Sequence, residues 1–513
     1  MADVLIGQAY FLRFDPKLWE AQQPYPPLGA LYAAAAVRAD GRAVAVFDAM
    51  LAQDESEWSD ALDRHRPTVA VLYEDSFNYL SKMCLLRMRD AALVMIDAAV
   101  ARGVTVLISG SDPSDHPSVY LDRGARAVVR GEGEATLVAA VSRLLEAPNE
   151  SLERVPGLVV RGADGVTRET GARPALQDLD ALPRPAWDLI DIDRYAQIWR
   201  RRHGRFSMHI VTTRGCPYRC NWCAKPIYGR RYTVRSAERV ADDIAYLRTT
   251  WAVDHLWIAD DIFGLKPGWV EAFAAALQVR GIRLPFRCLV RADQITPRFA
   301  RSLAASGCET AWIGAESGSQ RVLDAMDKGI TVAQITGATR HLRASGIAVG
   351  FFLQFGYPGE SRDDVDLTRA MVREAAPDDI GVSVSYPLPG TPFFERVKAD
   401  LGVRQNWIDS DDMAVLYKAT YPEAFYRDLH QLVHAEHRAR RAGAVLSRMV
   451  QAGRVCTSGA AVAGVQWLRY TVASWIHRAR LDTHRPNAHP TVAAVTLPVL
   501  TARPPALRAE AGR

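Results

Sequence analysis

Three cysteines that fall within eight residues are the strongest chemical signal in the chain: Cys216, Cys220 and Cys223. Three thiolates on one tight loop can hold three corners of a cubic [4Fe–4S] cluster, which leaves the fourth iron open to a substrate or cofactor. A structural zinc site is the alternative, but such a site normally has four protein ligands. The fourth would have to come from elsewhere, from His209 or His255. The count of three favours the cluster.

The remaining four cysteines are dispersed along the chain. Seven cysteines in 513 residues do not indicate a disulfide framework. Each of the four falls in an apolar or helical stretch, which favours a small, buried hydrophobic side chain. They are Cys84, Cys288, Cys308 and Cys456.

The composition is that of a globular protein and excludes several classes of function. Hydrophobic residues make up 49% and charged residues 24% of the chain, unlike a disordered or fibrous protein. A net charge of +5 over 513 residues is too dilute for a nucleic-acid-binding surface. No run of about 18 apolar residues is present, and the N-terminus has no signal-peptide pattern. We therefore expect a soluble, cytoplasmic protein with neither a nucleic-acid nor a membrane partner.

The elements that must position the cysteines form two βα alternations. In residues 1–150, short β-branched runs alternate with helical stretches, which favours a doubly wound parallel sheet. The predicted strands are 4–6, 43–47, 68–72, 104–108 and 127–129, and the predicted helices are 28–37, 82–101 and 135–145. Such sheets bind ligands beyond the carboxyl ends of their strands. Neither a Walker A loop nor a G-x-G-x-x-G segment is present, so a nucleotide is not the obvious ligand.

The second alternation follows a proline-containing stretch, 151–205, which indicates a linker with a small hairpin. Over residues 206–395, six strands alternate with helices, which favours a partial (β/α)6 barrel related to the complete eight-unit barrel. The strands are expected at 208–213, 255–261, 285–292, 309–316, 348–356 and 379–386. Residues 396–480 are predicted to be helical and 481–513 to form a loosely ordered tail. The predicted class is therefore α/β, with a Rossmann-like domain, a partial barrel and a helical region.

The cysteine segment resembles that of the radical S-adenosylmethionine (radical SAM) superfamily. It has the spacing C-x3-C-x2-C, an aromatic residue, Trp222, just before the last cysteine, and a position directly after the first barrel strand. The resemblance covers residues 205–395 and implies that the three cysteines bind a [4Fe–4S] cluster whose open iron binds SAM. One electron from that cluster then cleaves SAM and releases a 5′-deoxyadenosyl radical. The family resemblance also implies a one-electron donor such as flavodoxin or ferredoxin.

Three later residues occupy positions that resemble the SAM contacts of the family. Asp260 ends the second strand in an Asp-Asp form that departs from the plain Gly-Gly-Glu; it would accept from the SAM ammonium, or is a solvated loop acid. Glu316, in Gly-Ala-Glu-Ser-Gly, would accept from a ribose hydroxyl or the ammonium. Alternatively, Ser317 or Ser319 in that segment serves only as a helix N-cap. Gln354, near the end of the fifth strand, is a further candidate.

Residues 1–150 resemble the cobalamin-binding domain that precedes many radical SAM barrels. The resemblance rests on Tyr-Pro-Pro-Leu-Gly at 25–29 together with Arg-Gly-Glu-Gly-Glu at 130–134. The Asp-x-His-x-x-Gly motif that supplies a histidine to cobalt is absent, because His116 has the wrong spacing. We therefore expect cobalamin without a histidine on cobalt; the alternative is a degenerate domain that only packs on the barrel. The positions expected to face the corrin are Ser76, Gly110, Gly131 and Glu132.

Together the two resemblances imply a cobalamin-dependent radical SAM enzyme. Its most populated reaction is methylation of an unactivated carbon, in which the radical abstracts hydrogen, methylcobalamin delivers the methyl group and a second SAM remethylates the cobalt. Oxidative cyclisation or rearrangement, as in the anaerobic tetrapyrrole cyclase, is the alternative within this class. A non-catalytic iron–sulfur protein is the alternative outside it. The substrate is expected to be a small molecule or natural product that binds between the two domains.

Overall fold

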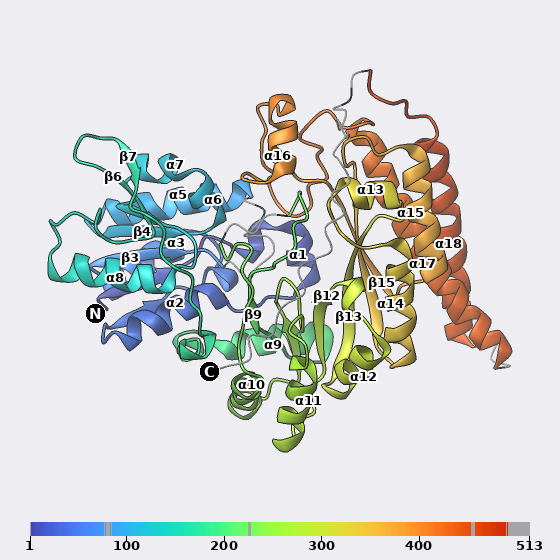
Figure 1. Ribbon diagram of the computed structural model, residues 1–513, viewed down its shortest axis with the longest axis horizontal. Helices are drawn as coiled ribbons and strands as arrows, with labels where there is room; N and C mark the ends of the chain where they lie inside the picture. Colours follow the sequence, from blue (N-terminus) through green and yellow to red (C-terminus); the bar gives the residue numbers. More distant parts are fainter. Residues whose placement is uncertain are drawn as a thin grey trace, which may run out of the picture.

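The computed structural model describes residues 2–75, 77, 83, 85–223, 227–452, 457–488 and 490. Ser76, Cys84, Cys456 and most of the expected loosely ordered tail lie outside the described residues. Within them, the chain forms two large sheets that lie side by side (Figure 1). The N-terminal sheet is drawn in blue to cyan and the second in green to yellow, with helices beyond it in orange and red.

The N-terminal sheet is doubly wound, as predicted. Its strand order is β2-β1-β3-β4-β5-β6-β7, and the first five of these strands are parallel. They are β1 (Val4–Gly7), β2 (Val44–Val46), β3 (Val69–Tyr73), β4 (Thr105–Ser109) and β5 (Ala127–Val129). Side chains alternate between the faces, so Leu5 packs against α3 (Ser56–His65) and α5 (Leu86–Val100). Val4 and Ile6 pack against α2 (Leu28–Ala39) and α8 (Glu134–Glu146).

Residues 151–205 continue this sheet toward the barrel. The expected hairpin is present: β6 (Leu158–Arg161) and β7 (Thr167–Glu169) add two antiparallel strands beside β5. The rest of the segment is more than a linker, because α9 (Ile192–His203) is buried between the two halves of the molecule. The Tyr195 hydroxyl donates to Asp48 at 2.8 Å, and Trp199 Nε1 donates to the Pro24 carbonyl oxygen at 2.6 Å.

The second sheet is the predicted partial barrel, with six parallel strands in the order β15-β14-β13-β12-β11-β8. They are β8 (Ser207–Ile210), β11 (His255–Ile258), β12 (Phe286–Val290), β13 (Cys308–Glu316), β14 (Ala348–Phe355) and β15 (Asp379–Val384). The helices that follow successive strands are α10 (Ala237–Trp251), α11 (Trp269–Val279), α12 (Pro297–Ala305), α14 (Val332–Ala344) and α15 (Arg362–Ala375).

The predicted extent of the first barrel strand was wrong. The expected strand at 208–213 ends at Ile210, and Thr213–Arg214 forms a separate strand, β9. β9 pairs antiparallel with β10 (Thr233–Val234), on the far side of the cysteine loop. This short ribbon closes the loop at its base.

The C-terminal region is helical, as predicted. It contains α16 (Pro392–Val397) and two long helices, α17 (Glu423–Gln451) and α18 (Ser458–Leu481). α17 packs on α15 and β15, and α18 lies along α17 at the outer edge of the molecule (Figure 1). None of the helices in the described ranges is both long and apolar enough to cross a membrane.

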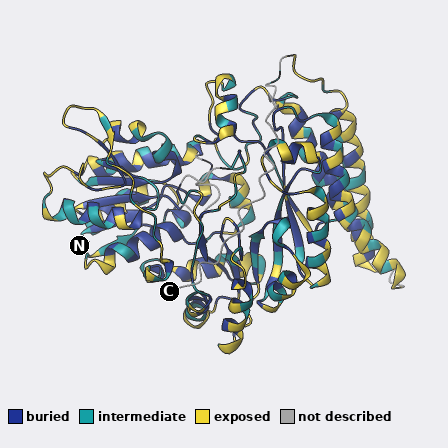
Figure 2. Ribbon diagram, in the orientation of Figure 1, coloured by how far each residue is buried: buried dark blue, intermediate teal, exposed yellow. Residues whose placement is uncertain are grey.

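One apolar cluster joins the N-terminal domain to the barrel. It contains Tyr10, Leu28 and Phe77 from the N-terminal domain together with Phe206 and Met208 from the barrel. The dark blue ribbon segments of Figure 2 accordingly occur in both sheets and between them. Because apolar burial joins the halves, the carboxyl ends of both sheets are held in a fixed relation.

Candidate active site

The cysteine loop begins where β8 ends, at the carboxyl end of the barrel, and Asp260 holds its first residues. The Asp260 carboxylate accepts hydrogen bonds from Thr212 N at 2.6 Å, from Thr213 N at 3.1 Å and from the Thr212 hydroxyl. Asp260 is 1% exposed, and burial raises its pKa to about 7 although these hydrogen bonds oppose the shift. The carboxylate is therefore engaged by the chain's own loop, and it fixes the residues that lead to the first cysteine.

Gly215 shapes the turn that precedes the first cysteine. Its φ is 77°, and a Cβ at this position would lie 1.9 Å from the Arg231 carbonyl oxygen. Only glycine fits such an approach. Cys216 N donates to the Gly229 carbonyl oxygen at 3.4 Å, so the loop closes on the residues that follow it. The three cysteines are half-buried on this closed loop.

Asn221, between the second and third cysteines, ties the loop to the rest of the barrel. Its Nδ2 donates to the Ala325 carbonyl oxygen and to Asp327, both at 2.8 Å, and its Oδ1 accepts from the Tyr357 hydroxyl at 2.9 Å. Its backbone N donates to the Met326 carbonyl oxygen at 3.0 Å. Across the described ranges, no three His, Cys, Asp or Glu residues form a group that could hold a metal ion. Asn221 therefore fixes the segment between Cys220 and Cys223 relative to the barrel.

Two buried cations flank the cysteine loop. Arg291, which follows β12, has its Nη1 3.9 Å from Cys220 Sγ and its guanidinium carbon 3.5 Å from the centre of the Tyr218 ring. Its Nη2 donates to the Lys328 carbonyl oxygen at 2.9 Å. Arg291 and Lys328 are each 7% exposed. Positive charge beside cysteines favours the thiolate, the form that binds metal.

Glu316 and Lys328 form a buried ion pair at the end of β13. Lys328 Nζ donates to Glu316 Oε1 at 2.8 Å. A Cβ on Gly314 would lie 2.7 Å from that carboxylate oxygen and 2.8 Å from the ammonium, so the pair requires glycine at 314. Burial acts to lower the pKa of Lys328, but the nearby Glu316 and Cys220 raise it above its ordinary value. The pair therefore places both signs of charge beside the cysteine loop.

Trp222 and Gln354 lie at the same end of the barrel. Lys328 Nζ is 5.8 Å from the centre of the Trp222 ring, whose buried Nε1 has no hydrogen-bond partner among the described residues. Gln354 is buried, and its Nε2 donates to the Ser385 hydroxyl at 2.8 Å. The helix-cap alternative for Ser319 is wrong, because α13 (Gln320–Ala325) has no side-chain cap and the Ser319 hydroxyl donates instead to Asp364.

A second polar cluster lies at the carboxyl edge of the N-terminal sheet, between β1 and β3, where the strand order reverses. Gln8 is fully buried, and within the described part of the chain neither of its amide atoms has a partner. Glu74 Oε1 accepts from Ala9 N at 3.0 Å, its Oε2 is likewise unpartnered there, and burial raises its pKa to about 8. Gly110 has a φ of 151°, and a Cβ on it would lie 2.7 Å from Glu74 Cβ. Ligands of doubly wound sheets bind at such reversal points.

Arg214 connects the cysteine loop to the predicted Arg-Gly-Glu-Gly-Glu loop. Its Nη1 donates to Glu132 at 2.5 Å, and its Nη2 donates to Glu134 at 2.6 Å. Glu132 was expected to face a corrin, but its carboxylate is engaged in this ion pair between the two domains. Gly131 faces the segment after the cysteines, since the atom nearest to a Cβ there is the Ile227 carbonyl oxygen at 3.8 Å.

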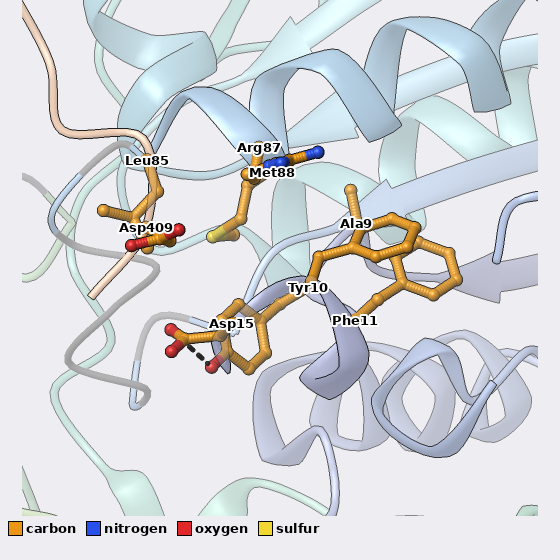
Figure 3. A pocket seen from close by; sticks show the side chains of 9 residues that line it. Ala9, Tyr10, Phe11, Asp15, Leu85, Arg87, Met88 and Asp409 are labelled. Atoms are coloured by element: carbon orange, nitrogen blue, oxygen red, sulfur yellow. Dashed lines mark hydrogen bonds between the residues drawn. The ribbon is translucent and has the colours of Figure 1, made fainter. Parts of the chain in front are cut away.

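A small cavity lies between the N-terminal sheet and the chain that follows α16 (Figure 3). The Tyr10 hydroxyl donates to Asp15 at 3.2 Å at its edge. Leu86 N donates to the Trp407 carbonyl oxygen at 2.9 Å, which brings Asp409 to the cavity. Its lining residues are Ala9, Tyr10, Phe11, Phe14, Asp15, Leu85, Arg87, Met88 and Asp409. The C-terminal region thus covers the N-terminal domain beside Gln8.

Comparison with protein-family models identifies the barrel. The model of the radical SAM superfamily matches residues 210–372, which run from the end of β8 into α15. The barrel of this chain belongs to the radical SAM superfamily. The matched stretch contains the cysteine loop and the predicted SAM contacts Asp260, Glu316 and Gln354. The predicted resemblance is therefore confirmed for the barrel.

Three curated relatives match parts of this chain. An uncharacterized methyltransferase of Pyrococcus horikoshii is 29% identical over 55% of this chain and 60% of its own length. The anaerobic magnesium-protoporphyrin IX monomethyl ester cyclase of Cereibacter sphaeroides is 29% identical over 54% of this chain and 45% of its own length. The hopanoid C-3 methylase of Methylococcus capsulatus is 26% identical over 80% of this chain and 77% of its own length. The aligned part of this chain thus covers less than two thirds of the length of each of the first two relatives.

Two solved structures share the fold of this chain, including its N-terminal domain. OxsB, a cobalamin-dependent S-adenosylmethionine radical enzyme solved with aqua-cobalamin, superposes with a TM-score of 0.70 at 17% identity over 93% of this chain and 72% of its own. TsrM from Kitasatospora setae, a radical S-adenosylmethionine methyltransferase solved with cobalamin and a [4Fe–4S] cluster, gives 0.63 at 19% identity over 79% of each chain. The predicted α/β class and two-domain fold are confirmed.

Several residues of the radical SAM site were not predicted from the sequence. Arg291 and Lys328 come from two different loops and Arg214 from β9, and nothing in their spacing marks them. Asn221 is the exception, because it lies between two of the three cysteines and could have been singled out. His209 and His255, weighed as a fourth zinc ligand, are buried in the barrel, where His209 packs edge-on to Tyr25.

Proposed function

We propose that the protein is a cobalamin-dependent radical SAM methyltransferase that acts on an unactivated carbon of a small molecule or natural product. The proposal rests on one observation: a single side chain links the cysteine loop of the barrel to the N-terminal domain. Arg214 stands two residues before Cys216 and binds Glu132 and Glu134 of the N-terminal domain. The cysteine loop of the barrel and the cofactor edge of the N-terminal sheet are thereby kept next to each other.

The cysteine loop fits a [4Fe–4S] cluster by its donor set. We propose that Cys216, Cys220 and Cys223 supply three thiolates and that Arg291 and Lys328 offset their negative charge. The cluster, when bound, supplies the electron that cleaves SAM. Glu316 and Lys328 offer an acceptor and a donor of opposite charge, which suits the ammonium and carboxylate of an amino-acid moiety. Trp222 Nε1 and Gln354 are the further polar groups proposed to face SAM.

The N-terminal edge fits a large polar cofactor by its unpartnered groups. Buried polar atoms are normally hydrogen-bonded, so Gln8 and Glu74 Oε2 mark positions where a ligand donates and accepts. Gly110 and Gly131 are the proposed positions of close backbone approach. Ser76 belongs to the same proposal but lies outside the described residues. His116 is half-buried, and burial lowers its pKa; we propose that cobalt has no histidine ligand.

Methyl transfer is preferred to cyclisation because two of the three relatives above carry the name of a methyltransferase or methylase. The cyclase relative keeps oxidative cyclisation as the second candidate. We propose a one-electron donor such as flavodoxin or ferredoxin for either reaction.

The domain limits remain predictions. They are 1–150, 151–205, 206–395, 396–480 and 481–513, and the hairpin of 158–169 pairs with the sheet of the first domain.

The deciding experiment requires no substrate. Protein reconstituted anaerobically with iron, sulfide and cobalamin is reduced and mixed with SAM. A methyltransferase is expected to form S-adenosylhomocysteine in an amount equal to the bound cobalamin, because SAM must methylate the cofactor. A cyclase is expected to form only 5′-deoxyadenosine. If no cobalamin binds under anaerobic loading, both candidates are excluded.

The cluster has its own test. Anaerobic reconstitution should give about four irons per chain. The triple substitution Cys216→Ala, Cys220→Ala and Cys223→Ala should remove them, whereas Cys288→Ala with Cys308→Ala, which alters two buried cysteines elsewhere, should not. Iron retained by the triple variant would contradict the assignment.

The proposal that cobalt has no histidine ligand has a separate test. The variant His116→Ala should leave the cobalamin spectrum unchanged.

A further inference from the structure

Helix α18 presents apolar side chains on the side that faces away from the protein. It packs on α17 through small residues such as Ala460, Ala463 and Ser474, which are buried. The opposite side carries Val465, which is 68% exposed, and Trp475, which is 66% exposed. Figure 2 shows this outermost helix largely in yellow. A helix on the surface of a globular protein normally has polar residues on that side.

The exposed apolar residues form one continuous stripe. Positions 465, 468, 472, 475 and 476 are spaced by three, four, three and one residues, which is the period of one helix face. Val465, Leu468, Val472, Trp475 and Ile476 all count among the exposed large hydrophobic residues. Single exposed apolar residues are normal, but a contiguous patch marks a surface that something covers.

The charge around this stripe has a single sign. Residues 438–481 contain eight arginines and neither aspartate nor glutamate. Arg441, Arg448 and Arg469 are exposed on the two helices, whereas Arg478 is bound to Glu436 at 2.7 Å. A second copy of this chain would bring the same arginines against one another. An anionic surface complements them instead.

We propose that α18 and the end of α17 bind the protein to the surface of an anionic lipid membrane. The stripe enters the boundary between headgroups and acyl chains, and the arginines contact lipid phosphates. Trp475, near the C-terminal end of the stripe, suits this position, because tryptophan favours the membrane–water interface. The sequence suggested no membrane partner because it lacks a spanning segment; a helix that lies in the interface needs none. This inference does not rest on the proposed function.

Vesicle cosedimentation of the full-length protein tests the proposal. The protein should sediment with vesicles of phosphatidylcholine and phosphatidylglycerol, and binding should fall with added salt and with phosphatidylcholine alone. The variant Val465→Glu, Leu468→Glu, Trp475→Glu should lose at least about tenfold in vesicle affinity, because three charges enter the apolar stripe. Arg441→Glu with Arg448→Glu and Arg469→Glu should lose a comparable factor on the anionic vesicles.

A matched control separates the stripe from general surface change. Val279, 85% exposed, and Val403 lie outside the two helices, so Val279→Glu with Val403→Glu adds charge at exposed valines without touching α18. This variant should bind vesicles like the parent, and all variants should keep the parent's thermal midpoint. Unchanged vesicle binding by the stripe variant overturns the proposal. So does a parent that is a dimer without vesicles and becomes a monomer in the stripe variant, because the stripe then binds a second copy.

Discussion

At the scale of single residues, Glu316 has one partner inside the chain and is proposed to bind SAM as well. It already accepts from Lys328 at 2.8 Å in a buried pair. Glu316→Ala would leave Lys328 buried without its counter-charge, which destabilises a protein strongly. Glu316→Gln is the more conservative change: both variants remove the counter-charge, but glutamine keeps the volume of the side chain and an oxygen that can accept from Lys328.

We expect Glu316→Gln to keep its iron content and to bind SAM more weakly by about 1.5–3 kcal/mol, the value of a hydrogen bond to a charged group. The dissociation constant of SAM is measured on reconstituted protein, with iron content as the control. If affinity equals that of the parent, Glu316 serves only Lys328 and is not a SAM contact.

Glu74 predicts a pH dependence of stability. Its pKa rises from 4.5 in the unfolded chain to about 8 in the folded protein, because burial disfavours the charged form. The folded protein thus holds a proton that the unfolded chain releases, so this stabilisation is full below pH 4.5 and is lost as the pH rises to about 8. We expect Glu74→Gln to gain stability relative to the parent between these limits, on the order of 3–5 kcal/mol.

Urea unfolding of the parent and of Glu74→Gln, in the absence of cofactors, measures this difference at several pH values. The two unfolding free energies should draw apart as the pH rises. A difference that does not change with pH would show that Glu74 is charged in the folded protein. Glu20→Gln, at an exposed glutamate on α1 (Pro16–Ala21), is the control that should follow the parent.

At the scale of elements, the cysteine loop depends on tethers that reach it from outside. Asn221 binds Ala325 and Asp327 at the end of α13 and Tyr357 beyond β14. We expect Asn221→Ala to lower the free energy of unfolding by about 1–3 kcal/mol, because buried partners lose their hydrogen bonds. We also expect it to reduce the iron retained after desalting.

Tyr357→Phe provides a graded comparison, because it removes only the hydroxyl from this set of tethers. Its effect on iron retention should have the same direction as that of Asn221→Ala and be smaller. Iron retention equal to the parent in both variants would mean that the loop keeps its shape without these tethers.

At the scale of the whole molecule, Arg214 couples the two domains. Its guanidinium lies between Glu132 and Glu134 and is 4% exposed. Removing one partner of a buried ion pair leaves an uncompensated charge. We expect Arg214→Met to lower the free energy of unfolding by about 3–5 kcal/mol and to weaken cobalamin loading.

A double-mutant cycle of Arg214→Met with Glu134→Gln separates the pair from the other effects of each change. The coupling energy should be about 1–3 kcal/mol. Arg38→Ala at an exposed ion pair with Asp188 is the control, and it should change stability by less than about 1 kcal/mol. A coupling energy near zero for Arg214 and Glu134 would mean that this ion pair does not help to join the domains.

Much of the site followed from the sequence because its signals are local. The cysteines are near neighbours in the chain, and Gly314 and Gly318 lie within two residues of Glu316. Glu132 shows the limit of such inference. Its loop was located correctly at the edge of the sheet, but the partner of its carboxylate lies 82 residues away, in Arg214.

The sequence by itself determined the two βα alternations, the three-cysteine loop after the first barrel strand and the polar edge of the N-terminal sheet. The periodicity of apolar residues and the spacing of the cysteines and glycines indicate these features, because each feature is made by residues that are close in the chain. Only the tertiary structure decided that Lys328 pairs with Glu316, that Asp260 holds the cysteine loop and that α18 faces outward with apolar side chains. Those facts depend on which distant segments pack together. Packing brings Lys328 to Glu316 and Asp260 to the cysteine loop. It also leaves the apolar stripe of α18 uncovered among the described residues.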